Sequence, residues 1–126
     1  MKALCYGHDG VAHTLFPSIV EELAKRGHDS IVWPPGVRGV AAANIEDLYD
    51  CDVGLLNLAS FQTQEELVPF SVLVALDKPV VVIADVPGAE CRKKARPFAP
   101  QAYGLIFPLE FGRDAAERFG YQSDRI

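Results

Sequence analysis

The residues best suited to chemistry lie together in a loop near the amino terminus. This loop reads Gly7-His8-Asp9-Gly10-Val11-Ala12-His13. An imidazole that a carboxylate orients is a common general base for a hydroxyl nucleophile, and His13 or His8 could act in this way beside Asp9. Gly7 and Gly10 would let a substrate or a phosphate approach the backbone and the amino end of the following helix. An alternative stays open, in which Asp9 makes only local turn hydrogen bonds and the histidines are exposed.

The spacing of this loop excludes two common nucleotide signatures. Gly-x-x-Gly is not the Gly-x-Gly-x-x-Gly pattern of dinucleotide binding, and no Gly-Lys-Ser or Gly-Lys-Thr follows it, as a P-loop would require. Further candidates for ligand binding follow the later predicted strands. They are Asn57, Ser60, Asp85, Gly88 and Glu110.

Each of these later candidates also has a structural interpretation. Asn57 and Ser60 could bind a ligand or could satisfy backbone groups of a loop. Asp85 ends the most apolar strand, an unusual place for a carboxylate, but an Asp that opens a Pro-Gly turn needs no function. Glu110 could simply begin a helix, where its negative charge is favourable.

The elements that would position these residues alternate between strand and helix patterns. We expect strands at residues 2–6, 30–33, 53–58, 80–84 and 103–107. We expect helices at residues 14–26, 44–50, 64–76, 89–95 and 110–119. Thr14 is the predicted N-cap of the first helix, Pro17 would fall in its first turn, and Gly27 would end it. Pro69 would interrupt or bend the third helix.

This alternation predicts one α/β domain over residues 1–126. Right-handed crossovers would give a three-layer α/β/α sandwich with a doubly wound, mainly parallel five-stranded sheet. In such folds, ligands bind at the carboxyl ends of the strands, near the point where the strand order reverses. The loop from Gly7 to His13 and the other candidate residues would meet at this edge.

Composition narrows the classes of partner. The net charge of −5 argues against nucleic acid, and we interpret the basic run at residues 92–96 as the solvated face of a helix. No apolar run approaches the length of a membrane span and no signal peptide opens the chain, so we expect a cytoplasmic protein. Cys5, Cys51 and Cys91 lack the close spacing of a zinc or redox motif, and we expect reduced thiols, no metal and no cofactor.

Segments at both ends of the chain carry a family resemblance. The opening segment reads Gly7-x-x-Gly10-Val11-Ala12-His13-Thr14-Leu15-Phe16-Pro17, and Glu22-Leu23-Ala24-Lys25-Arg26-Gly27-His28-Asp29 follows it. The closing segments read Leu105-Ile106-Phe107-Pro108-Leu109-Glu110-Phe111, then Ala115-Ala116-Glu117-Arg118-Phe119-Gly120-Tyr121 and Asp124-Arg125-Ile126. Together they resemble the amino-terminal domain of GT-B-fold glycosyltransferases and of the related UDP-N-acetylglucosamine 2-epimerase group.

The resemblance implies a Rossmann-like, acceptor-side domain that would be inactive alone. A second, carboxyl-terminal domain would bind most of the nucleotide-sugar donor, and the acceptor would carry a hydroxyl group. In inverting members a base near the first loop takes the acceptor proton, which assigns this role to His13, with Asp9 or Asp85 as the orienting carboxylate. His8 competes for the role, and retaining members use no such base. The segment from residue 33 to residue 51 is shorter than the corresponding segment of fuller family members, which usually have more strands there.

Two other classes of protein share this predicted architecture. A receiver-like signalling domain needs an acidic cluster after the first strand and an Asp at the end of the third strand to accept phosphate. In this chain Asp9 is the only acid in the first loop, and Asn57 is nearest the position of the phosphate acceptor. Only a degenerate, partner-binding receiver therefore fits. Two other segments resemble nucleoside deoxyribosyltransferases. They are Cys51-Asp52-Val53 and Leu76-Asp77-Lys78-Pro79-Val80-Val81. If this chain were such an enzyme, its nucleophilic carboxylate would be Glu65 or Glu66.

Overall fold

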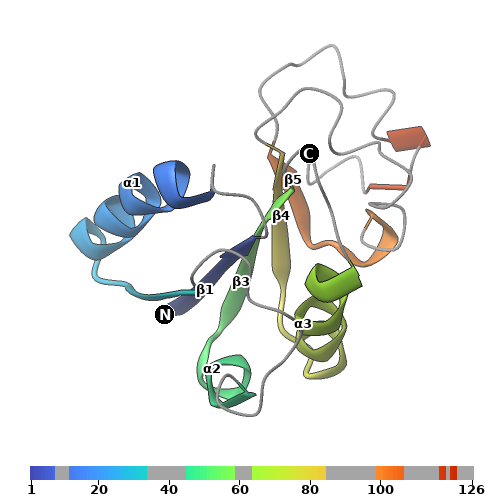
Figure 1. Ribbon diagram of the computed structural model, residues 1–126, viewed down its shortest axis with the longest axis horizontal. Coiled ribbons are helices and arrows are strands. Elements are labelled where there is room, and N and C mark those ends of the chain that lie inside the picture. Colours follow the sequence, from blue (N-terminus) through green and yellow to red (C-terminus); the bar gives the residue numbers. More distant parts are fainter. Residues whose placement is uncertain are drawn as a thin grey trace.

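The computed structural model describes residues 1–7, 12–33, 45–58, 64–84, 99–106, 117–118 and 120–121. These residues form an α/β fold in which helices cover both faces of a parallel sheet (Figure 1). The predicted fold class is therefore confirmed. No helix in the described ranges is long and apolar enough to cross a membrane.

The sheet has the strand order β2-β1-β3-β4-β5, and every neighbouring pair is parallel. The strands are β1 (Lys2–Gly7), β2 (Asp29–Val32), β3 (Val53–Leu58), β4 (Val80–Ala84) and β5 (Gly104–Ile106). The three inner strands are almost wholly apolar, as expected where helices cover both faces of a parallel sheet. The strand β5 is shorter than the predicted segment 103–107, because Tyr103 precedes its first residue and residue 107 lies outside the described part.

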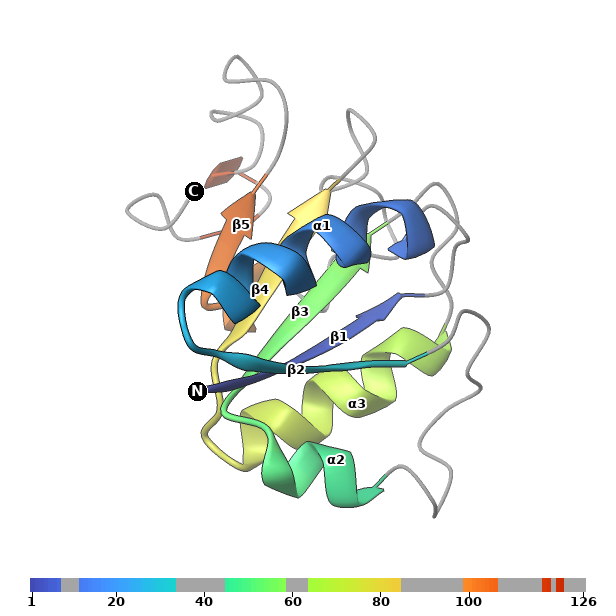
Figure 2. The ribbon, with the colours of Figure 1, turned by 90° about the vertical axis from the view of Figure 1, so that its left-hand side faces the viewer.

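Within the described residues, three α-helices flank the sheet, and Figure 2 shows them from a second side. They are α1 (Ala12–Lys25), α2 (Ile45–Asp50) and α3 (Gln64–Ala75). The helix α1 covers one face of the sheet, whereas α2 and α3 cover the other (Figure 1). The predicted helices at 44–50 and 64–76 are confirmed to within one residue, and α3 continues through Pro69.

The predicted start of α1 is wrong. The helix begins at Ala12, so Thr14 lies inside its first turn and Pro17 lies beyond that turn. Alanine is the strongest helix former, and Ala12 extends the helix ahead of the expected cap. Because Pro17 has no amide proton, it cannot donate a hydrogen bond to the carbonyl oxygen of His13, four residues earlier.

The predicted end of α1 at Gly27 is confirmed. Gly27 has a φ of 80°, and the amide of His28 donates a hydrogen bond of 2.9 Å to the carbonyl oxygen of Leu23. This hydrogen bond closes the last turn, in which only glycine has no steric penalty. The predicted turn at residues 85–88 and helix at 89–95 lie outside the described residues. Of the predicted helix at 110–119, only residues 117–118 are described, and they are helical.

The core forms on both faces of the sheet. Between the sheet and the helices α2 and α3 lie the buried side chains of Leu4, Tyr6, Trp33, Leu48, Leu56, Phe70, Leu73, Val80 and Val82. Between the sheet and α1 lie Cys5 and Phe16, with Leu55 and Ile19 partly buried against them. Burial of these side chains is the main favourable contribution to folding.

Gly54 in β3 sets how closely α3 packs on the sheet. A Cβ atom at this position would lie 2.7 Å from Cδ1 of Leu73 in α3 and 3.3 Å from Cγ2 of Val80 in β4. Real Cβ atoms do not approach other carbons to 2.7 Å, so any side chain here must displace Leu73. The absence of a side chain at Gly54 therefore lets Leu73 pack directly against the backbone of β3.

We expect Gly54→Ala to lower the free energy of unfolding by about 1–3 kcal/mol, because the new methyl group overpacks this contact. Urea unfolding followed through the fluorescence of Trp33, the single tryptophan, measures the change. In a Leu73→Ala background the same substitution should cost much less, since the clashing methyl group is gone. Equal costs in both backgrounds would show that Leu73 does not limit the approach of α3.

Candidate functional site

The candidate site lies where the order of the strands reverses. After β1 the chain adds β2 on one side, and it then crosses to add β3 on the other side of β1. This is the strand order of flavodoxin-like doubly wound folds, in which ligands bind at the carboxyl ends of the strands on either side of the reversal. Here those strands are β1 and β3.

Gly7 and Asn57 meet at this position. They are opposite one another in the register of β1 and β3, at the carboxyl end of the paired segment. Partners in a parallel pair have side chains on the same face of the sheet. The pair two residues earlier, Cys5 and Leu55, is on that same face and packs against α1. Gly7 therefore places no side chain beside Asn57, on the face that α1 covers.

Asn57 differs in chemistry from the rest of the described core. Its side chain is 0% exposed, and among the described residues it is the polar member of the fully buried set. Burial of a carboxamide is costly unless its polar atoms have partners. The polar atoms of Asn57 therefore need hydrogen-bond partners at the carboxyl end of β3.

The first turn of α1 lies at the same edge of the sheet. Figure 2 shows the start of α1 beside the arrowheads of β1 and β3. The amino end of a helix carries partial positive charge and free amide protons, which favour anions and polar groups of a ligand. His13 is in this turn, although its side chain lies outside the described part of the structure.

The other predicted site residues remain untested. The structure brings Gly7 and Asn57 together and places the first turn of α1, which contains His13, at the same edge of the sheet. The remaining candidates fall outside the described residues. They are His8, Asp9, Gly10, Ser60, Asp85, Gly88 and Glu110.

A polar contact that the sequence did not reveal lies on the opposite face, near the same edge. Nε1 of Trp33 donates a hydrogen bond of 2.7 Å to Oδ2 of Asp47, in the first turn of α2. The ring of Tyr6 lies 5.9 Å from that of Trp33, with an interplanar angle of 51°. Trp33 and Tyr6 are buried, so this contact joins the ends of β1 and β2 to α2. A buried tryptophan usually has a hydrogen-bond partner for its N–H group. The single tryptophan of the sequence therefore indicates that such a partner exists, but not which residue it is.

The described cysteines are poor nucleophiles. Burial raises the pKa of Cys5 to about 11. Burial also raises the pKa of Cys51, whose thiol donates a hydrogen bond to the carbonyl oxygen of Leu48. The interpretation of both as buried, reduced thiols is confirmed. Among the residues with described positions, no group of three or more His, Cys, Asp or Glu could hold a metal ion.

Comparison with protein-family models finds no match, and comparison with curated proteins finds no significant one. The likeness to glycosyltransferases therefore rests on the segments quoted from the sequence.

We expect Asp47→Ala to lower the free energy of unfolding by about 1.5–3 kcal/mol, because it leaves the buried N–H group of Trp33 without an acceptor. Asp47→Asn should cost less, since the amide oxygen still accepts the hydrogen bond. Urea unfolding measures both variants, and equal stabilities would contradict a role for this hydrogen bond.

We expect Cys5 and Cys51 to resist thiol reagents in the folded protein. At pH 8 a thiol with a pKa of about 11 is ionised in about one molecule per thousand. In a Cys91→Ser variant, reaction with a chromogenic disulfide should be slow in buffer and complete in guanidinium chloride. Rapid reaction of either thiol in buffer would disprove its burial.

Proposed function

We propose that this chain is the acceptor-side domain of a GT-B-type glycosyltransferase. Its part is to bind a hydroxyl-bearing acceptor at the carboxyl ends of β1 and β3, while a second domain holds the nucleotide sugar. The observation that carries this proposal is the pairing of Gly7 with the buried Asn57 at the reversal of strand order. The open backbone at Gly7 gives the acceptor room, and the first turn of α1 forms the adjoining wall.

The proposed base is His13. A neutral imidazole can accept a proton, which is what this role requires. The acceptor oxygen bonds to the anomeric carbon of the donor as its proton passes to His13. The bond between that carbon and the phosphate oxygen breaks, and the nucleoside diphosphate leaves with the bonding pair. Asp9 or Asp85 would orient the imidazole.

This assignment implies a cytoplasmic enzyme without nucleic-acid partners and without a cofactor. The net charge of −5 supports the absence of nucleic acid, whose backbone attracts clustered basic residues. The reaction requires only a base and two bound substrates.

A receiver-like domain is the second candidate, because receivers share the strand order seen here. The residue at the end of β3 is Asn57, whose amide does not accept a phosphoryl group and whose side chain is buried. Any receiver function would therefore be restricted to partner binding. For a nucleoside deoxyribosyltransferase, the nucleophile would be Glu65 or Glu66, which lie in the first turn of α3.

We expect UDP to bind this chain weakly or not at all, because the donor site belongs to the second domain. Titration followed by backbone amide chemical shifts measures the affinity. Tight binding of UDP would contradict the proposed division of substrates and would favour a self-sufficient nucleoside enzyme.

In a protein that carries both domains, we expect His13→Ala to lower kcat by at least about 100-fold and to leave the KM for the acceptor within a few-fold. A general base acts in the transition state, so its loss affects turnover more than binding. His28→Ala, beyond the opposite end of α1, is the matched control and should retain turnover. Unchanged turnover in His13→Ala would remove this residue from the mechanism.

A further inference from the structure

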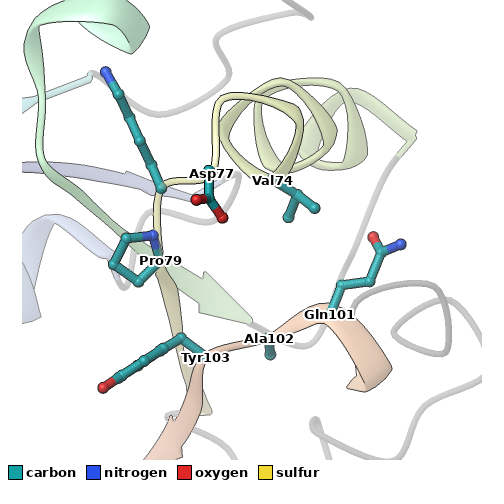
Figure 3. A pocket seen from close by; sticks show the side chains of 7 residues that line it. Val74, Asp77, Pro79, Gln101, Ala102 and Tyr103 are labelled. Atoms are coloured by element: carbon teal, nitrogen blue, oxygen red, sulfur yellow. The ribbon is translucent and has the colours of Figure 1, made fainter.

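A cavity of about 310 Å³ opens at the opposite edge of the sheet, where β4 and β5 begin. It lies between the turn after α3 and the short helix η4 (Ala99–Gln101). Its lining includes Val74, Asp77, Pro79, Gln101, Ala102 and Tyr103 (Figure 3). This is the amino edge of the strands, so the cavity is separate from the proposed acceptor site.

The carboxylate of Asp77 lies at the rim of this cavity, at the carboxyl end of α3, where a negative charge is unfavourable. Asp77 follows α3 in the left-handed region, with a φ of 59°, which Gly, Asn and Asp adopt more readily than other residues. Its amide donates to the carbonyl oxygen of Val74, and the amide of Lys78 donates to that of Leu73. A negative charge at this carboxyl end of the helix also faces the negative pole of the helix dipole. No basic residue in the last turn of α3 offsets this charge.

Lys78 also lines the cavity, but its ammonium group is directed away from Asp77. Nζ of Lys78 donates hydrogen bonds to the carbonyl oxygens of Leu48, at 2.7 Å, and of Tyr49. These bonds satisfy the carboxyl end of α2 instead of neutralising Asp77. Within the part of the chain that the structure describes, no cation forms an ion pair with Asp77. Among the described residues, the rim of the cavity therefore combines a carboxylate that has no ion-pair partner with the negative end of a helix.

We propose that this cavity binds a primary ammonium or guanidinium group on a short apolar stem. Asp77 pairs with the cation, and the side-chain oxygen of Gln101, across the cavity in Figure 3, is a second acceptor. Val74, Pro79 and Ala102 give the stem an apolar surface. Ligand pockets span about 300–1,000 Å³, so a cavity near the lower limit suits an alkylammonium group better than a nucleotide-sized ligand. The cation could belong to a free amine or to a lysine or arginine side chain of a partner protein.

The test compares probes that share a stem and differ in charge. n-Butylammonium and n-butylguanidinium should each shift the amide signals of Asp77, Lys78 and Ala102 in a saturable way, and n-butanol should not. The effect should weaken as salt is raised, because the carboxylate is exposed. Equal shifts with n-butanol, or no saturable shift with either cation, would overturn the proposal.

Variants at Asp77 separate binding from folding. Asp77→Asn and Asp77→Gly both suit the left-handed backbone and remove the charge. We expect at least about a tenfold loss of affinity for n-butylammonium, with a melting temperature equal to or above that of the wild type. Asp29→Asn, at the start of β2 on the far side of the sheet, removes the same charge and should leave binding unchanged. Retained affinity in both Asp77 variants would overturn the proposal.

A third probe, a blocked Gly-Lys-Gly peptide, distinguishes a free amine from a side chain of a partner protein as the source of the cation. Tighter binding of the peptide than of n-butylammonium would identify a protein partner as the source. Equal or weaker binding of the peptide would identify a free amine. Both results support the cation site, and neither depends on glycosyl transfer at the opposite edge.

Discussion

The parallel pairing of β1 with β3 is the contact on which the other features of this fold depend. It sets Leu4 opposite Gly54 and Gly7 opposite Asn57, so one register fixes both the packing of α3 and the composition of the candidate site. A shift by one residue would exchange the faces of the strand. Leu56 would then leave the core beside α3, and Asn57 would enter it. The burial of apolar side chains on both faces therefore also specifies which residues meet at the carboxyl edge.

The two edges of the sheet differ in electrostatic character because the helices run opposite to the strands. The helix α1 begins at the edge where β1 and β3 end (Figure 2), and it brings partial positive charge to that edge. At the other edge α3 ends, and Asp77 adds a carboxylate to the negative pole of this helix. The same architecture thus offers a site suited to anionic and polar ligands and, on the opposite edge, a cavity suited to cations.

Sequence patterns predicted the features that depend on neighbours along the chain. The apolar runs of β3 and β4 indicated buried parallel strands, and Gly27 indicated the end of α1. The start of α1 was placed too late, because cap preference at Thr14 is weaker evidence than the helix propensity of Ala12. The hydrogen bond from Trp33 to Asp47 and the cavity beside Asp77 join residues distant in sequence. Neither periodicity nor spacing carries information about such contacts. Asn57 was predictable as a candidate because a polar residue interrupts an apolar strand, but only the register revealed Gly7 as its neighbour.

The most direct test of the central claim is whether hydroxyl-bearing ligands bind beside Gly7 and Asn57. Backbone amide chemical shifts can be followed while the chain is titrated with a panel of monosaccharides and polyols, in the wild type and in a Gly7→Val variant. Valine suits a strand and places a side chain on the proposed acceptor surface. We predict saturable shifts at the amides of Gly7 and Asn57 that disappear in the variant while its stability is retained. Shifts that are absent from these amides, or that persist unchanged in Gly7→Val, would contradict the account.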